Sequence, residues 1–250
     1  MEKINYTLHT LSSLIVSPRA NTAFYKELGG FQDISGEVPF LAKDKLKLIY
    51  PFYQYGEYIE YAPENAVYYL PGSSVKGALF CGSSIPGGFM VDDVAVQNSD
   101  IVLRNLNKLQ FLEDEQKACI KVFFENVGVE MIKAGSKMMG EFYIKDRESA
   151  EQLLTAASKS TNTKLYQMLN YLRDLEKRGY SEDLLCKLKC VIDKLSCLLD
   201  ANDIFLFGGY KGLLHSMELK GSAQEIAGAV YLDPYIMLPH GLARIKLCNA

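Results

Sequence analysis

The sequence has no long apolar segment, and this absence limits where the protein can work. No run approaches the roughly 20 apolar residues that a membrane-spanning helix needs. The N-terminal stretch 1–6, Met-Glu-Lys-Ile-Asn-Tyr, lacks the uninterrupted apolar core of a secretory signal peptide. We therefore expect a cytoplasmic protein that has no membrane partner.

An excess of positive charge is also missing. The chain carries 27 lysines and arginines against 30 aspartates and glutamates, for a formal net charge of −3. A protein that finds nucleic acid on its own by long-range attraction is usually basic. The charge therefore argues against a free-standing nucleic-acid binder, although it allows a local basic groove inside an assembly.

None of the 6 cysteines belongs to a Cys-x-x-Cys pair, which argues against a zinc ribbon or a thioredoxin-like motif. Free thiols in a reducing cytosol explain them most simply. Cys186, Cys190 and Cys197 are predicted on one face of a helix, opposite a leucine stripe. Because no histidine or fourth cysteine lies nearby in the sequence, we expect this face to pack on another helix or subunit rather than to bind a metal.

Strand-like and helix-like patterns alternate along the chain, which predicts an α+β fold. Hydrophobic residues make up 48% of the 250 residues, enough for a full core in one elaborated domain or two intimate ones. We expect a core at 1–146, a helical segment at about 147–200, and C-terminal strands with a glycine-rich loop at 201–250 that complete the core. The predicted strands cover residues 4–16, 89–96, 203–207 and 242–248, and a hairpin is predicted at 118–145.

The most informative motif is Pro-Gly-Ser-Ser-Val-Lys-Gly at residues 71–77, after a strand-like run at 67–70. Gly72 allows a tight bend, and Ser73 or Ser74 can cap a helix whose first turns hold Lys76. Free amides at a helix N-terminus, beside hydroxyls and an ammonium, form a site for a phosphate oxygen. The motif is not the nucleotide-binding loop Gly-x-x-x-x-Gly-Lys-Ser/Thr, because here the lysine precedes the second glycine.

The motif at 71–77 resembles the signature of the RAMP superfamily, the RNA-binding subunits of CRISPR effector complexes. Further family features follow in the expected order along most of residues 67–250. They are a Val-x-Asp-type strand at 89–94, a strand with Glu130 before an Ala-Gly turn, and a glycine-rich loop at 208–212. The closing stretch 238–246 resembles the ending of the subunit that caps the type III-A backbone.

This resemblance implies a ferredoxin-like, RNA-recognition-like core in one or two modules, whose sheet and glycine loops clasp the guide RNA backbone. It implies a guide-RNA-binding subunit of a type III CRISPR interference complex that caps the backbone at the guide 3′ end. The implied partners are the guide RNA, the other subunits and, indirectly, target RNA; catalysis, cofactor and metal are not expected. RNA contacts are expected at Arg19, Gly72, Ser73, Ser74, Lys76, Gly208, Gly209 and Lys211.

Two other roles within the superfamily stay open. A guide-RNA-processing endoribonuclease works without metal and often uses histidine as general acid or base, and this chain offers His9, His215 and His240. A repeating backbone subunit cuts target RNA with a loop aspartate, for which Asp33 is the positional match. The tyrosines at 50, 53, 55, 58 and 61 could stack on RNA bases or belong to the core or an interface.

Overall fold

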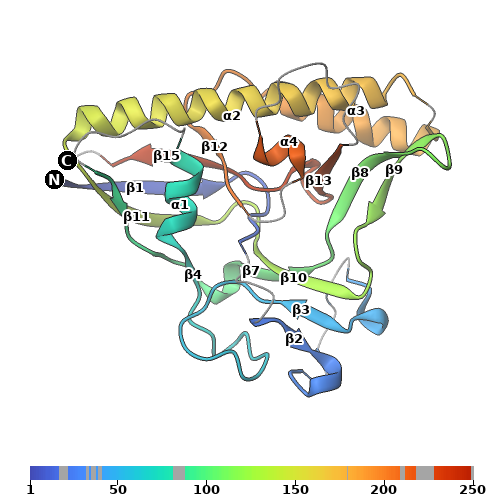
Figure 1. The fold of residues 1–250 in the computed structure, drawn as a ribbon, viewed down its shortest axis with the longest axis horizontal. Coiled ribbons are helices and arrows are strands. Elements are labelled where there is room, and N and C mark those ends of the chain that lie inside the picture. Colours follow the sequence, from blue (N-terminus) through green and yellow to red (C-terminus); the bar gives the residue numbers. More distant parts are fainter. Residues whose placement is uncertain are drawn as a thin grey trace.

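The structure is a computed structural model in which α-helices accompany mostly antiparallel strands, so the predicted α+β class is confirmed (Figure 1). It describes residues 1–16, 22–31, 34, 38, 41–80, 88–178, 180–208, 212–217 and 228–248. Among these residues no helix is both long and apolar enough to cross a membrane.

A five-stranded sheet forms the centre of the fold, in the order β12-β15-β1-β11-β5 with antiparallel neighbours. Its strands are β1 (Glu2–Thr10), β5 (Met90–Val91), β11 (Lys137–Ile144), β12 (Ile204–Leu206) and β15 (Leu242–Leu247). Helix α1 (Gly72–Leu79) lies between β1 and β5 in the chain, and α2 (Arg147–Leu175) follows β11. Strands β1, β5, β11 and β15 with these two helices reproduce the β-α-β-β-α-β arrangement of a ferredoxin-like fold, to which β12 adds an edge strand. The predicted ferredoxin-like core is therefore confirmed.

Strict alternation in β1 decides which face of this sheet is buried. Ile4, Tyr6 and Leu8 point into one hydrophobic core, where they meet side chains of both α1 and α2. Gly140 lies opposite Tyr6 in β11, and a Cβ there would come within 2.3 Å of the Tyr6 ring. A glycine at this position thus lets the large ring lie flat across the sheet.

Two further sheets extend the molecule away from α1 (Figure 1). One has the order β2-β3-β10-β7 and the other β14-β13-β8-β9, while β4 and β6 form a separate pair. Their bounds are β2 (Phe24–Tyr25), β3 (Leu48–Tyr50), β4 (Tyr69–Leu70), β6 (Val94–Ala95), β7 (Ile101–Arg104), β8 (Asn107–Leu112), β9 (Lys117–Val122), β10 (Val127–Ile132), β13 (Ala229–Asp233) and β14 (Leu238–Pro239). Short 3-10 helices cover Lys26–Leu28, Lys43–Lys45 and Asn98–Asp100.

The hairpin predicted at 118–145 is wrong, although its strands exist. Strands β9, β10 and β11 follow one another in the chain but belong to three different sheets. β9 pairs with β8, β10 with β3 and β7, and β11 with β1. Alternation identifies strands but does not identify their partners, which are chosen here by packing between distant segments.

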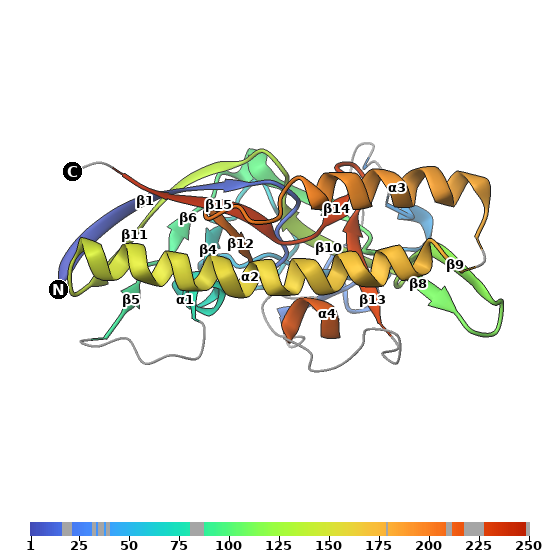
Figure 2. The same ribbon diagram turned by 90° about the horizontal axis from the view of Figure 1, so that it is seen from above.

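The predicted helical segment is confirmed as α2 and α3 (Glu182–Ser196), and a short α4 (Leu213–Ser216) follows later. Asp146 caps α2 by accepting a hydrogen bond from the Ser149 amide at 2.8 Å, and Ser181 caps α3. The first half of α2 packs on the ferredoxin-like core and its second half packs with α3 in a second core. Figure 2 shows α1 and α3 on opposite sides of α2. The division into three segments stays a prediction.

Candidate nucleic-acid interface

Helix α1 starts inside the signature motif, earlier than the sequence predicts. Pro71 is the N-cap and Gly72 the first helical residue, and no side chain caps this end. The amide of Gly72 instead donates to Asp93 Oδ1 at 2.8 Å. The predicted cap by Ser73 or Ser74 is therefore wrong, because a carboxylate from another segment already holds the first amide of the helix.

Gly72 is needed for packing at this helix start. It is buried, and a Cβ on it would lie 2.2 Å from the carbonyl oxygen of Val91 in β5. Only a residue without a side chain lets the start of α1 approach this strand so closely. The structure thus gives Gly72 a role in positioning α1 against the edge of the central sheet.

The exposed part of the motif lies on the first two turns of α1. Val75 and Leu79 face the core, whereas Ser73, Lys76 and Gly77 are exposed. No ion pair joins Lys76 to any described residue. The ammonium and the serine hydroxyl are therefore accessible, as a contact with an RNA backbone requires.

An aromatic stack adjoins the start of α1. The ring of Tyr55 stacks on that of Tyr69 with 4.1 Å between centroids. The ring of Tyr53 also packs on Tyr69, with 5.7 Å between centroids. The Tyr55 hydroxyl donates to Asp93 Oδ2 at 3.2 Å, so this tyrosine and Gly72 share one carboxylate. Tyr55 is 57% exposed, which leaves it available for a further contact.

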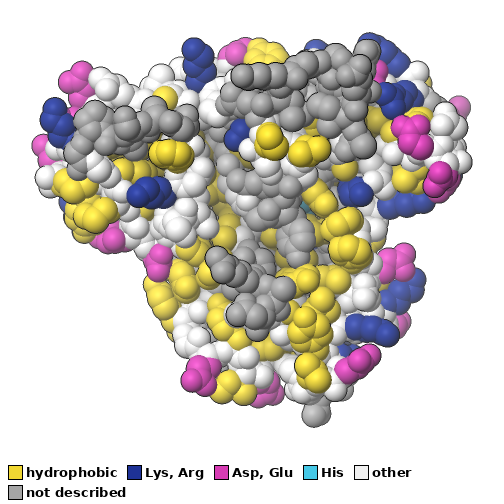
Figure 3. Space-filling view, in the orientation of Figure 1, with side chains coloured by type: hydrophobic (Ala, Val, Ile, Leu, Met, Phe, Trp, Pro, Cys, Tyr) yellow, Lys and Arg dark blue, Asp and Glu magenta, His cyan; other side chains and the backbone are white. Residues whose placement is uncertain are grey.

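The other predicted stacking tyrosines, at 50, 58 and 61, are all partly buried. Tyr58 and Tyr61 pack on the buried Phe24 ring, at 6.3 and 5.7 Å between centroids. Hydrophobic side chains gather over the lower part of the face in Figure 3, where β2, β3 and β10 lie. The structure therefore assigns Tyr58 and Tyr61 to internal packing.

Glu130 holds the tyrosine-rich segment in place from inside β10. It is 1% exposed and accepts hydrogen bonds from the Phe52 amide at 2.9 Å and the Tyr68 hydroxyl at 2.7 Å. The Tyr61 hydroxyl is a third donor to this carboxylate. Burial raises the pKa of Glu130 despite these donors. The sequence marked this glutamate only as a family feature and gave no sign of its partners.

The second predicted glycine loop begins at the edge of the sheet beside β12. Gly208 has a φ of +112°, and a Cβ on it would lie 2.7 Å from the carbonyl oxygen of Ile15. Gly208 therefore lies next to the chain that follows β1. Arg19, Gly209 and Lys211, the other predicted RNA contacts here, lie outside the described residues, as does Asp33.

Two of the three histidines are structural. His215 is buried in α4, where its Nε2 accepts a hydrogen bond from the Tyr231 amide at 3.3 Å. His240 is also buried, with Nδ1 3.3 Å from the Ser13 carbonyl oxygen, and burial lowers its pKa. Only His9, in β1, is partly exposed. A nuclease role would therefore have to use His9.

A buried carboxylate beside His240 joins the two ends of the chain. Asp233 Oδ2 accepts hydrogen bonds from Ser13, at 2.9 Å from its amide and 2.5 Å from its hydroxyl. Burial alone would raise the pKa of Asp233, but the Ser13 bonds and nearby His240 lower it overall. Arg104 lies 3.8 Å away and stacks on the Tyr235 ring at 3.7 Å. The Ser13 hydroxyl donates to the carboxylate, so the group lacks the serine–histidine bond of a hydrolytic triad.

The three cysteines predicted on one helix face lie on and just after α3. Cys186 and Cys197 are exposed and Cys190 is half-buried, and the described residues contain no group of three or more potential metal ligands. What covers this face stays a prediction.

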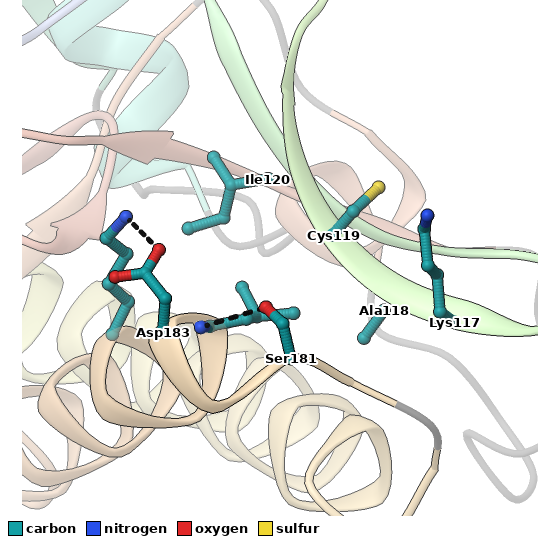
Figure 4. Close-up of a pocket in the computed structure, with 8 residues that line it drawn as sticks. Lys117, Ala118, Cys119, Ile120, Ser181 and Asp183 are labelled. Carbon is teal, nitrogen blue, oxygen red and sulfur yellow. Dashed lines mark hydrogen bonds and ion pairs between the residues drawn. The ribbon is translucent and has the colours of Figure 1, made fainter.

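A cavity of about 230 Å³ lies between β9 and the start of α3 (Figure 4). Burial raises the pKa of the Cys119 thiol at its rim. Its two lysines are already paired, Lys117 with Glu115 and Lys187 with Asp183. The cavity therefore offers no unpaired cation to an anionic ligand.

Comparison with known proteins identifies the fold. No family model and no curated protein matches the sequence. A chain from the cryo-EM structure of a Csm–crRNA–target RNA ternary complex of a type III-A CRISPR–Cas system is similar, with a TM-score of 0.58 and 11% sequence identity. The match covers 97% of this chain and 100% of that one. The crystal structure of T. onnurineus Csm5 matches with a TM-score of 0.47 and 13% identity over 95% of this chain and 99% of that one. The chain therefore has the fold of a chain found in a type III-A effector complex, as its resemblance to the RAMP superfamily predicts.

Proposed function

We propose that this chain is a guide-RNA-binding subunit of a type III CRISPR interference complex, which caps the backbone at the guide 3′ end. Its partners are the guide RNA and neighbouring subunits, and it meets target RNA only through the guide. The observation that carries the proposal is the coincidence of two independent features. The RAMP signature at 71–77 exposes Ser73, Lys76 and Gly77 on α1, and the chain shares its fold with a chain of a Csm–crRNA–target RNA complex over 97% of its length.

The contact that we assign first is the Lys76 ammonium on an RNA phosphate, with Ser73 beside it. Both are exposed on the same turn of α1, and no described carboxylate pairs with Lys76. Contacts of this kind fix the position of a strand without reading its bases. We propose binding without catalysis, because two of the three histidines are committed to internal packing.

Reconstitution with guide RNA tests the proposal. The full chain, co-expressed with the other subunits and a guide, should purify with that RNA. Lys76→Ala should weaken guide retention and reduce the salt dependence of binding by about one phosphate contact, a change in slope of about 0.7 for single-stranded RNA. Lys159→Ala, an exposed lysine of α2, is the matched control and should leave the slope unchanged.

The capping role has its own test in the stoichiometry. A cap occupies one end of the guide, so native mass spectrometry should find one copy per complex for guides of different lengths. A copy number that grows with guide length would instead identify a repeating backbone subunit. Complete absence of guide RNA from the complex that contains the wild-type chain would overturn the RNA-binding role itself.

A further inference from the structure

The central sheet has a second face, which α1 and α2 do not cover. The residues of β1 that alternate with the buried ones are Lys3, Asn5, Thr7 and His9, and all are exposed except the half-exposed His9. Their partners in β11 include Lys137 and Met139, which are also exposed. This face is therefore open to solvent over the two central strands of the ferredoxin-like core.

Basic side chains form a row across one end of this open face. His9 pairs with Lys137 of β11 on one side and with Arg244 of β15 on the other. Lys246 lies in the adjacent row, opposite Thr7. Directly paired residues on neighbouring strands have Cβ atoms about 4.5–5.5 Å apart, so these four side chains with Thr7 form one continuous patch.

Carboxylates do not neutralise the patch. Arg244 and Lys246 share one anion, Asp203, at 3.7 Å each, and no ion pair joins Lys137 to the described residues. Arg244 Nε is buried and has no hydrogen-bond partner among the described residues. Three cations thus face a single carboxylate, in a chain whose formal net charge is −3.

The opposite end of the same face has no excess of positive charge among its described residues. Lys3 pairs there with Glu141, and Glu141 also accepts a hydrogen bond from Tyr143 at 3.1 Å. Asp92 adds a further carboxylate beside this pair, and its pKa is raised by desolvation and by Glu141. Positive charge is therefore concentrated at the end of the sheet where β1 finishes.

The geometry points to a phosphate-binding row for single-stranded RNA, formed by Lys137, His9 and Arg244 with Lys246 beside them. The cations, the imidazole of His9 and the hydroxyl of Thr7 can all donate to phosphate oxygens, and charged and polar groups dominate the row, although Met139 opposite Thr7 is also exposed. The row lies apart from α1, on the face of the sheet that α1 does not cover. This inference rests on the proposed function and adds a second, separate contact region to it.

Salt-dependent binding of a labelled single-stranded RNA by the full chain tests the row. In the double variant Lys137→Ala/Lys246→Ala, the slope of log affinity against log salt should fall by about 1.4, or about 0.7 per lost contact. At 0.1 M salt each lost contact should weaken binding about fivefold. The double variant Lys159→Ala/Lys187→Ala removes the same charge from α2 and α3 and should change neither quantity. Both exchanged sheet residues are exposed, so the urea midpoint should stay at the wild-type value.

The outcomes separate this inference from the proposed function. Wild-type protein that binds no RNA, alone or in the complex, defeats both. RNA binding that weakens with Lys76→Ala but keeps its slope in the Lys137→Ala/Lys246→Ala variant overturns the row and leaves the proposed function standing. A sheet variant that keeps its RNA affinity but no longer enters the complex would identify the face as a protein interface, which also overturns the row.

Discussion

The amide of Gly72 donates to Asp93 Oδ1 at 2.8 Å, so the first amide of α1 is bound to an anion of the protein itself. The partial positive charge at a helix N-terminus favours such a carboxylate. A phosphate brought to the same point would meet a negative charge. This relationship moves the expected RNA contact from the amide of Gly72 to the exposed side chains of Ser73, the next residue, and Lys76, about one turn further on.

Removal of the Asp93 carboxylate should therefore have opposite effects on stability and on RNA binding. Asp93→Ala loses the hydrogen bond to the Gly72 amide and the contact with the Tyr55 hydroxyl. Because the Asp93 carboxylate is exposed, this loss should lower the free energy of unfolding by only about 1 kcal/mol. RNA affinity should rise at low salt, because a negative charge at the start of the helix that carries Lys76 is gone. Urea unfolding and RNA titration measure the two effects. Asp92→Ala, which leaves the Gly72 bond intact, is the control, and equal effects of both variants would contradict the role given to Asp93.

The two glycines of the signature should respond differently to alanine. A Cβ at Gly72 would lie 2.2 Å from a main-chain oxygen, so Gly72→Ala should displace the start of α1 and cost several kcal/mol of stability, about 2 or more. A Cβ at Gly77 has no described atom within 4 Å, and alanine favours a helix over glycine by about 0.5–1 kcal/mol. Gly77→Ala should therefore raise the urea midpoint. If a strand held by Lys76 uses the open space over Gly77, the same variant weakens RNA binding. A similar loss of stability in both variants would contradict this division of roles.

Much of the fold could be predicted from the sequence because its signals are local. The alternation at 4–16 predicted the first strand, which the structure has at Glu2–Thr10, and the helical pattern between 147 and 200 predicted the segment that forms α2 and α3. Ser181, the cap of α3, is a local signal of the same kind, since a cap acts within one turn.

The rest depends on partners that are far apart in the chain. Ser13 and Asp233 are 220 positions apart, and Glu130 joins a segment 78 positions away. No spacing rule marks such pairs in a single sequence. The acceptor for the first amide of α1 could not be predicted for the same reason, because Asp93 lies in the segment that follows β5.

Glu130 should make stability depend on pH in a specific direction. Burial raises its pKa in the folded protein above the unfolded value of about 4.3. The folded state therefore holds this proton more tightly, and the contribution of Glu130 to the free energy of unfolding is full below pH about 4 and declines as the pH rises through the folded pKa. The difference in the free energy of unfolding between wild type and Glu130→Gln should decrease as the pH rises, by at most about 1.4 kcal/mol per pH unit. Urea unfolding at a series of pH values measures it.

The control for this dependence is Glu125→Gln, because Glu125 is exposed and paired with Lys45 at 2.5 Å. The difference in the free energy of unfolding between wild type and Glu125→Gln should not show the pH dependence expected for Glu130→Gln. Glu130→Ala should be much less stable at every pH, since it leaves the Phe52 amide and the Tyr68 hydroxyl without their acceptor, at about 1–3 kcal/mol each. An advantage of wild type over Glu130→Gln that grows between pH 4 and 7 would show that Glu130 is held as a stabilised anion.

The absence of catalysis can be tested on the one accessible histidine. The full chain, incubated with repeat RNA in EDTA, should leave the RNA intact, because general acid–base cleavage needs a histidine that can reach the substrate and only His9 is partly exposed. Cleavage that persists in EDTA and disappears in His9→Ala, but not in Asn5→Ala on the same face, would identify a processing nuclease. Cleavage unchanged by His9→Ala would point to a contaminant, since His215 and His240 are buried. Intact RNA that is nevertheless bound, with an affinity that falls in His9→Ala, is the result expected if this imidazole holds a phosphate without transferring a proton.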